Sequence, residues 1–127
     1  MLLLILFVLF YIFVEQKSIE ISASGLTQSY SLNIKEADKK FLNKQLDLTG
    51  KVKSYIQFGD ANSILELATD DKELNLYCIL VSKDISEKAS TFTSGTKVTI
   101  YGKCLGLNPH KSVKYLSGIY IETENIK

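Results

Sequence analysis

Two cysteines, Cys78 and Cys104, are the residues whose reactivity would matter most if the fold brought them together. Both fall on the apolar side of segments in which apolar and polar residues alternate, so we expect both thiols to point inward. They could form a disulfide if the domain lies outside the cytoplasm, or they could remain buried thiols that pack as small hydrophobic groups. The residues leave both alternatives open. With one histidine and no second cysteine pair, the sequence predicts no metal site and no cofactor.

Six further side chains lie on the polar side of three predicted strands and could form a ligand surface: Lys51, Lys53, Tyr55, Tyr77, Tyr101 and Lys103. Aromatic rings for stacking, interleaved with cations, are the mixture that proteins use to bind single-stranded nucleic acids. The alternative is that tyrosine and lysine simply suit the exposed faces of strands. We therefore treat the six residues as a candidate site.

Catalytic motifs are missing from the sequence. There is no phosphate-binding P-loop, no nucleophile elbow and no zinc-protease motif. The acidic turn formed by Asp70, Asp71 and Glu73 does not have the spacing of a calcium-binding loop. We predict that the chain is not an enzyme and has no catalytic residues.

The charge of the chain is nearly balanced, with 15 basic against 14 acidic residues and a formal net charge of +1. All the basic residues are lysines, and arginine, the side chain suited to bidentate recognition of phosphate and guanine, is absent. A dedicated nucleic-acid-binding protein normally has a marked excess of positive charge. Nucleic acid is therefore a possible partner that the composition does not favour.

The N-terminus departs from the rest of the chain, because residues 1–14 are all apolar or aromatic. A run of this length is shorter than the roughly 20 residues that cross a bilayer squarely. We expect an uncleaved hydrophobic helix that anchors the chain in a membrane. The alternatives are a signal peptide cleaved near the small residues 22–25, or a buried helix of the domain. Residues 15–32 are polar with scattered apolar positions and are predicted to be a linker that could become helical near the domain.

Hydrophobic periodicity divides residues 33–127 into two helices and five strands. Asn33, followed three residues later by Glu36, is typical of a helix N-terminus, and apolar residues at helical spacing continue to Phe41. From Leu46 onward the period changes to two. We expect strands at 46–58, 63–69, 74–81, 96–103 and 113–122, with the second helix at 83–92.

The first predicted strand has an inward row that contains a glycine: Leu46, Leu48, Gly50, Val52 and Ile56. Five strands with a helix between the third and the fourth is the element order of the OB-fold, a small Greek-key barrel. In such a barrel the long first strand must bend to serve both halves, and a glycine leaves room at the bend. Gly102 could have the same role in the fourth strand. We predict a mainly β, five-stranded OB-fold barrel over 33–127, with a five-stranded sandwich as the alternative.

Three stretches of the sequence, "EADKKFLNKQLDLTGKV", "LYCIL" and "GTKVTIYGKCLG", resemble the tRNA-anticodon-binding-like (tRNA_anti-like) family of small bacterial OB-fold proteins. The resemblance covers roughly residues 33–122. It implies an OB-fold, which in this family often follows a membrane segment or a lipoprotein signal, and it implies no enzymatic activity. Family members often carry a further cysteine in the last strand. This chain has Gly118 near that position, so the resemblance does not supply a disulfide partner.

Together, these observations predict a membrane-anchored, extracytoplasmic OB-fold module that binds a protein or an oligomeric ligand without catalysis. The membrane would be contacted through residues 1–14. The alternative is a single-stranded nucleic-acid or tRNA-binding OB-fold domain. A third possibility is a protein-interaction module that presents the edge of its sheet to a partner.

Overall fold

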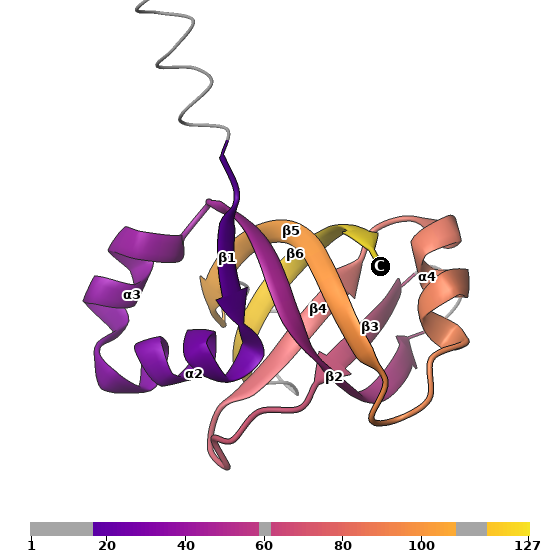
Figure 1. The fold of residues 1–127 in the computed structure, drawn as a ribbon, viewed down its shortest axis with the longest axis horizontal. Coiled ribbons are helices and arrows are strands. Elements are labelled where there is room, and N and C mark those ends of the chain that lie inside the picture. Colours follow the sequence, from indigo (N-terminus) through magenta and orange to yellow (C-terminus); the bar gives the residue numbers. More distant parts are fainter. Residues whose placement is uncertain (1–16, 59–61, 109–116) are drawn as a thin grey trace, which may run out of the picture.

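The computed structural model describes residues 17–58, 62–108 and 117–127. The order of strands and helices along the chain differs from the prediction only at its beginning (Figure 1). The elements are β1 (Ile19–Ser22), α2 (Ala23–Leu32), α3 (Ile34–Phe41), β2 (Gln45–Phe58), β3 (Asn62–Leu67), β4 (Asn75–Leu80), α4 (Lys83–Ser90), β5 (Lys97–Leu107) and β6 (Gly118–Ile126).

The sheet has the strand order β1-β2-β3-β4-β6-β5, and a further pairing between β2 and β5 closes it into a barrel. Neighbouring strands are antiparallel except for the parallel pairs β1–β2 and β4–β6. Five strands form the barrel, α4 joins β4 to β5, and β1 adds to the outside of β2. This connectivity confirms the predicted OB-fold.

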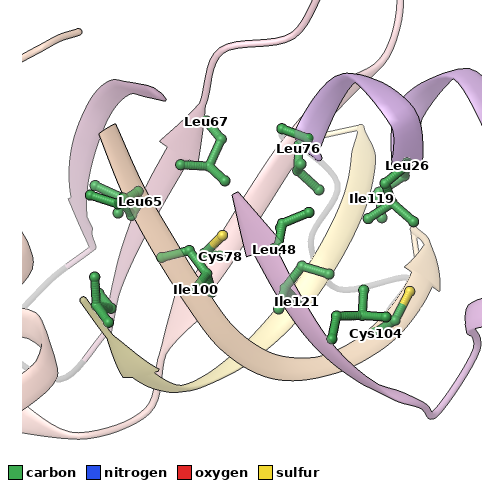
Figure 2. Packing of buried hydrophobic residues seen from close by; sticks show 14 of the residues in the cluster. Leu26, Leu48, Leu65, Leu67, Leu76, Cys78, Ile100, Cys104, Ile119 and Ile121 are labelled. Atoms are coloured by element: carbon green, nitrogen blue, oxygen red, sulfur yellow. The ribbon is translucent and has the colours of Figure 1, made fainter. Parts of the chain in front are cut away.

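Apolar side chains from every strand fill the barrel, and Figure 2 shows Leu48, Ile100 and Ile121 among them. Figure 1 places α2 and α4 at opposite ends of the barrel. Leu26 of α2 is fully buried at one end, where Figure 2 shows it beside Ile119, and Ala89 of α4 is fully buried at the other. The two helices therefore close a core that the strands alone would leave open to water.

A β-bulge divides β2 into two halves. The register between β2 and β3 shifts between Val52 and Ser54, so the alternation of inward and outward side chains changes phase at Lys53. Beyond this point Tyr55 packs against the interior, and Ile56 packs against an apolar cluster on the outer side of the sheet. The prediction that Ile56 faces inward and Tyr55 outward is therefore wrong, because parity counted from Leu46 holds only as far as the bulge.

Gly50 and Gly102 each allow a close approach of neighbouring chain. A methyl group at Gly50 would lie 3.1 Å from the Cβ of Ala23 and 3.3 Å from Cδ1 of Leu67, so this glycine admits the first residue of α2. A methyl group at Gly102 would overlap the carbonyl oxygen of Glu122, where the β5–β6 register shifts. Both glycines make room for packing, and the neighbour at Gly50 is the start of α2, whereas the prediction had placed this glycine at a bend of the strand.

The segment from Lys17 to Leu32 corrects the prediction of a linker at 15–32. β1 pairs in parallel with β2, with Ile19 opposite Leu46 and Ser22 opposite Thr49. The side chain of Ser22 then caps α2 by accepting a hydrogen bond from the Gly25 amide at 3.0 Å. The pattern had not revealed this strand because its four residues obtain their partners from a distant part of the chain.

Tyr30 of α2 joins the two N-terminal helices to the barrel. Its hydroxyl donates to Oδ1 of Asp38 on α3 at 2.8 Å and lies 3.8 Å from Sγ of Cys104 on β5. Burial, together with the hydrogen bond to Asp38, raises the pKa of Tyr30 well above its usual range. The phenol therefore stays protonated as the donor of this contact.

The remaining predicted elements differ from the structure mainly at their ends. Asn33 caps α3 by accepting from the Glu36 amide, as the sequence predicted. β5 continues past Gly102 to Leu107, and β6 runs from Gly118 to Ile126, past the predicted end at 122. The first part of the predicted last strand, 113–116, lies outside the described residues. The predicted hydrophobic helix at 1–14 lies outside the described residues. Among the residues that are described, no helix has the length and apolar character needed to cross a membrane.

Asp71, in the turn between β3 and β4, is hydrogen-bonded to the C-terminal end of α2. Its carboxylate accepts a hydrogen bond from Ser31 Oγ and two more from the amides of Glu73 and Leu74, at 2.9 and 3.2 Å. These bonds, that of Ser31 first, lower the pKa of Asp71. A carboxyl group whose pKa is lowered by folding stabilises the fold above its unfolded pKa of about 3.9, and this contribution is lost as the pH falls through the folded value.

We expect the alanine variants of the two glycines to differ in stability. Gly50→Ala should cost about 1 kcal/mol, because Ala23 of α2 and the side chain of Leu67 need to shift by only a few tenths of an ångström. Gly102→Ala should cost about 3 kcal/mol or more, because the paired backbone of β6 cannot move without opening the sheet. Urea denaturation of the full chain in detergent, followed by circular dichroism, measures both. Equal losses would contradict the close approach at Gly102.

We also expect Asp71→Asn to destabilise the chain more at pH 7 than at pH 3. The substitution removes a charged acceptor whose stabilising effect is lost as the pH falls below the unfolded pKa and through the lowered folded pKa, so the difference from wild type should shrink as the pH falls. Urea midpoints at the two pH values measure this change. Asp70→Asn, which removes the adjacent charge, is the control; a similar pH dependence in both variants would show that general charge, and not the hydrogen bonds of Asp71, is responsible.

Candidate ligand-binding surface

A groove of about 660 Å³ opens where the end of β1 and the start of α2 meet β2, β5 and the last residue of the chain. We call it the lysine groove and define it by six of its basic and hydroxyl-bearing residues: Ser22, Thr49, Lys51, Lys97, Thr99 and Lys127. Only one of the six predicted ligand residues, Lys51, lines it. The sequence analysis did not identify the other five residues of the lysine groove, because only the pairing of distant strands brings them together.

Strand register explains how the lysine groove forms. Lys51 of β2 lies directly opposite Lys97 of β5, and Thr49 lies opposite Thr99. Backbone hydrogen bonds of 2.8 and 2.9 Å between Thr99 and Lys127 bring the C-terminal lysine beside the same pair of strands. Positions that are 46 residues apart, such as Lys51 and Lys97, therefore share one surface.

Tyr101 and Lys103 continue this outer face along β5. The ammonium group of Lys127 lies 5.6 Å from the centroid of the Tyr101 ring, a cation–π contact that places a half-buried aromatic ring next to the lysine groove. Lys103 is two residues further along the strand, opposite Gln45 of β2 and Glu122 of β6. The structure thus keeps Lys51, Tyr101 and Lys103 on one side of the barrel.

The other three predicted ligand residues lie elsewhere. Lys53, at the bulge, forms an ion pair with Glu66 of β3, with Nζ 3.1 Å from Oε2. The ring of Tyr55 is turned toward α4, where its hydroxyl lies 2.9 Å from Oγ of Ser86. Tyr77 belongs to the outer side of β4. The six residues therefore do not form a single surface.

Tyr77 packs against Tyr120 of β6, with ring centroids 5.5 Å apart, on the outer side of β3, β4 and β6. Both rings are buried, with exposed fractions of 4% and 1%, in a cluster completed by Ile56, Ile64, Ile79 and Leu105. Burial raises the pKa of Tyr120 to about 12. OB-folds commonly bind oligomers on the corresponding face. In this chain the rings are covered, so the face does not offer an open stacking platform. Tyr120 could have been found by its alternation with Ile119 and Ile121.

Both cysteines are free and buried, which is the second of the two alternatives that the sequence left open. Cys78 and Cys104 lie on either side of β6, each opposite Ile121. Two strand spacings separate them by about 10 Å, whereas a disulfide needs Cα atoms roughly 4.4–6.8 Å apart. Burial raises the pKa of the Cys78 thiol to about 12 and also raises that of Cys104. Neither thiol is available as a nucleophile in the folded chain.

The titratable groups with shifted pKa values lie away from the lysine groove. The titratable groups with clearly raised pKa values are tyrosines and cysteines that pack in the core or between strands, and none of them lines the lysine groove. Within the described ranges, no group of three histidine, cysteine or acidic side chains could hold a metal ion. The groove offers ammonium groups and hydroxyls, which can bind an anion.

Solved structures share this barrel at low sequence identity. A protein of Klebsiella pneumoniae that is named as a nucleic acid-binding lipoprotein aligns with a TM-score of 0.59 and 16% identity, over 87% of this chain and 90% of that one. The asparaginyl-tRNA synthetase of Pyrococcus horikoshii aligns with a TM-score of 0.52 and 15% identity, over 69% of this chain. The aligned region is only 19% of the synthetase, so the likeness concerns one domain of that enzyme. These likenesses show the OB-fold.

The family to which the chain belongs follows from its sequence, which matches a family model. No curated protein matches the sequence significantly. The family model tRNA_anti-like matches residues 12–114, which include β1, both N-terminal helices and the barrel as far as β5. This match covers most of the 127 residues, and the chain therefore belongs to the tRNA_anti-like family of OB-fold proteins.

Proposed function

We propose that this chain is a non-catalytic OB-fold binding module, held at a membrane by residues 1–14 with its barrel outside the cytoplasm. The observation that carries the binding role is the lysine groove, an open surface that combines ammonium groups with hydroxyls. The two cysteine thiols, by contrast, are buried in the core and cannot reach a ligand. An ammonium-and-hydroxyl surface can hold a ligand, and it lacks the paired nucleophile and base that covalent catalysis requires.

The position of β1 supports a lasting tether. A cut within the small residues 22–25 would remove β1 from the sheet and the Ser22 cap from α2. Ile19 and Ile21 of the same strand also pack against the core. A peptidase cleaving there would remove part of the folded domain, which argues for an apolar segment that stays attached. The lipoprotein name of the similar Klebsiella protein agrees with a place at a membrane.

We expect a cysteine introduced at Ser94 to reveal the side of the membrane on which the barrel lies. Ser94 is exposed in the turn before β5, whereas Cys78 and Cys104 are buried thiols with raised pKa values. In intact bacterial cells that express the full chain, a membrane-impermeant maleimide should label Ser94→Cys and not the wild type. The chain should also stay in the membrane pellet after alkaline extraction.

Two controls make this labelling decisive. The wild type should react after denaturation without a reducing agent, because its thiols are free. Labelling of Ser94→Cys only after lysis would overturn the extracytoplasmic location. Release of the chain into the alkaline supernatant would overturn the tether, and neither result would bear on the lysine groove.

A single-stranded nucleic acid is the second candidate ligand, and one observation favours it. Tyr101 lies under Lys127 at 5.6 Å and beside the lysine groove, so a base could stack on the ring while its phosphates meet the lysines. The name of the Klebsiella protein points in the same direction. The formal net charge of +1 and the lack of arginine weigh against tight, general binding of this kind.

If nucleic acid is the ligand, Tyr101→Ala should weaken the binding of a fluorescent oligothymidine by about tenfold. The loss of one stacked base costs roughly 1–3 kcal/mol. Fluorescence anisotropy with the full chain in phosphatidylcholine nanodiscs at low salt measures the affinity. Tyr55→Phe is the control, because Tyr55 faces the interior near α4. Wild-type protein that fails to bind at low salt would remove nucleic acid as a ligand.

A further inference from the structure

Two positive charges face each other on the barrel, and neither forms an ion pair within the described part of the chain. Lys51 and Lys97 are directly opposite in the antiparallel pair of β2 and β5, and both are exposed. Like charges at directly opposite positions of a sheet are destabilising. The ion pairs found in the described part of the chain are Lys39–Glu36 and Lys53–Glu66, so neither member of the opposed pair has a carboxylate within ion-pair distance there.

A third ammonium group comes from Lys127, the last residue, which also carries an α-carboxylate. Lys127 lines the same groove, held beside β5 by its backbone hydrogen bonds to Thr99. Asp70 is the one acidic side chain among the groove-lining residues of the described chain, against three lysines. The hydroxyl groups of Thr49 and Thr99, which are opposite each other on β2 and β5, add neutral donors between the cations.

We propose that the lysine groove binds a phosphate group, supplied either by the backbone of a single strand or by a small phosphorylated molecule. A phosphate carries more than one negative charge and several acceptor oxygens, so it can meet two or three ammonium groups and the hydroxyls together. Bound phosphate would also remove the repulsion between Lys51 and Lys97. This inference rests on the binding role proposed above and not on the membrane tether.

The phosphate site differs from the face that OB-folds usually present to oligomers. That face corresponds to the outer side of β3, β4 and β6, where the rings of Tyr77 and Tyr120 are buried. The lysine groove lies between the start of α2, the start of β5 and the residue that follows β6. The N-terminal strand β1, which is additional to the barrel, supplies one wall through Ser22.

Thermal unfolding in pyrophosphate tests the proposal. The full chain in phosphatidylcholine nanodiscs should gain about 5 °C in Tm in about 10 mM pyrophosphate over sodium chloride of equal ionic strength, as expected for a Kd on the order of 1 mM. Lys97→Thr should lose this gain, and its ligand-free Tm should exceed that of the wild type because the like-charge pair is gone. Lys83→Thr on α4, outside the groove, removes an equal charge and should keep the gain.

Three results would overturn the phosphate site: no gain over chloride in the wild type, an equal gain in Lys97→Thr, or a ligand-free Tm of Lys97→Thr no higher than that of Lys83→Thr. Competition between pyrophosphate and an oligothymidine shows which kind of molecule supplies the phosphate. Displacement of a bound oligothymidine by pyrophosphate supports a phosphodiester strand, whereas a gain with pyrophosphate but no oligonucleotide binding supports a small phosphorylated molecule. Failure with both anions overturns the site and leaves the maleimide result at Ser94 unaffected.

Discussion

Closure of the barrel depends on β2, because this one strand forms ladders with two others on the barrel and with β1 outside it. Its first half pairs with β5 over residues 45–51, and its second half pairs with β3 over residues 52–58. A strand that serves both halves of a small barrel has to bend between them. Here the bend comes with a bulge at Lys53 and a glycine at position 50, and the partner strands change at the same place.

This change of partners leaves room beside the first half of β2, and the N-terminal segment occupies it. β3 begins to pair only at Val52, so the edge of β2 before that residue is free for β1. The first residue of α2 then packs over Gly50, where a side chain would obstruct it. The extra strand, the capped helix and the lysine groove therefore all follow from the geometry of one strand.

Local periodicity was sufficient to predict the barrel, since apolar and polar residues alternate in its strands, as in β5. The Asn33–Glu36 pair likewise marks the start of α3. It could not predict features that depend on pairing between distant segments. The bulge at Lys53 leaves no mark in the alternation, so the orientations of Tyr55 and Ile56 were exchanged. The four-residue β1 is too short to show a period. The candidate site was affected most, because the opposition of Lys51 and Lys97 exists only once the register is known.

The same register gives the N-terminal segment a fixed relation to the lysine groove. Ile19 and Ser22 are the two ends of β1, about 10 Å apart at the rise of an extended strand. Ser22 lines the groove, and Lys17 stands two residues before the strand. Because β1 is bonded to β2 along its whole length, no flexible linker separates the described N-terminus from the binding surface. If residues 1–14 tether the chain to a membrane, as we propose, a ligand bound by the lysines would be held on the same domain face that β1 helps to form.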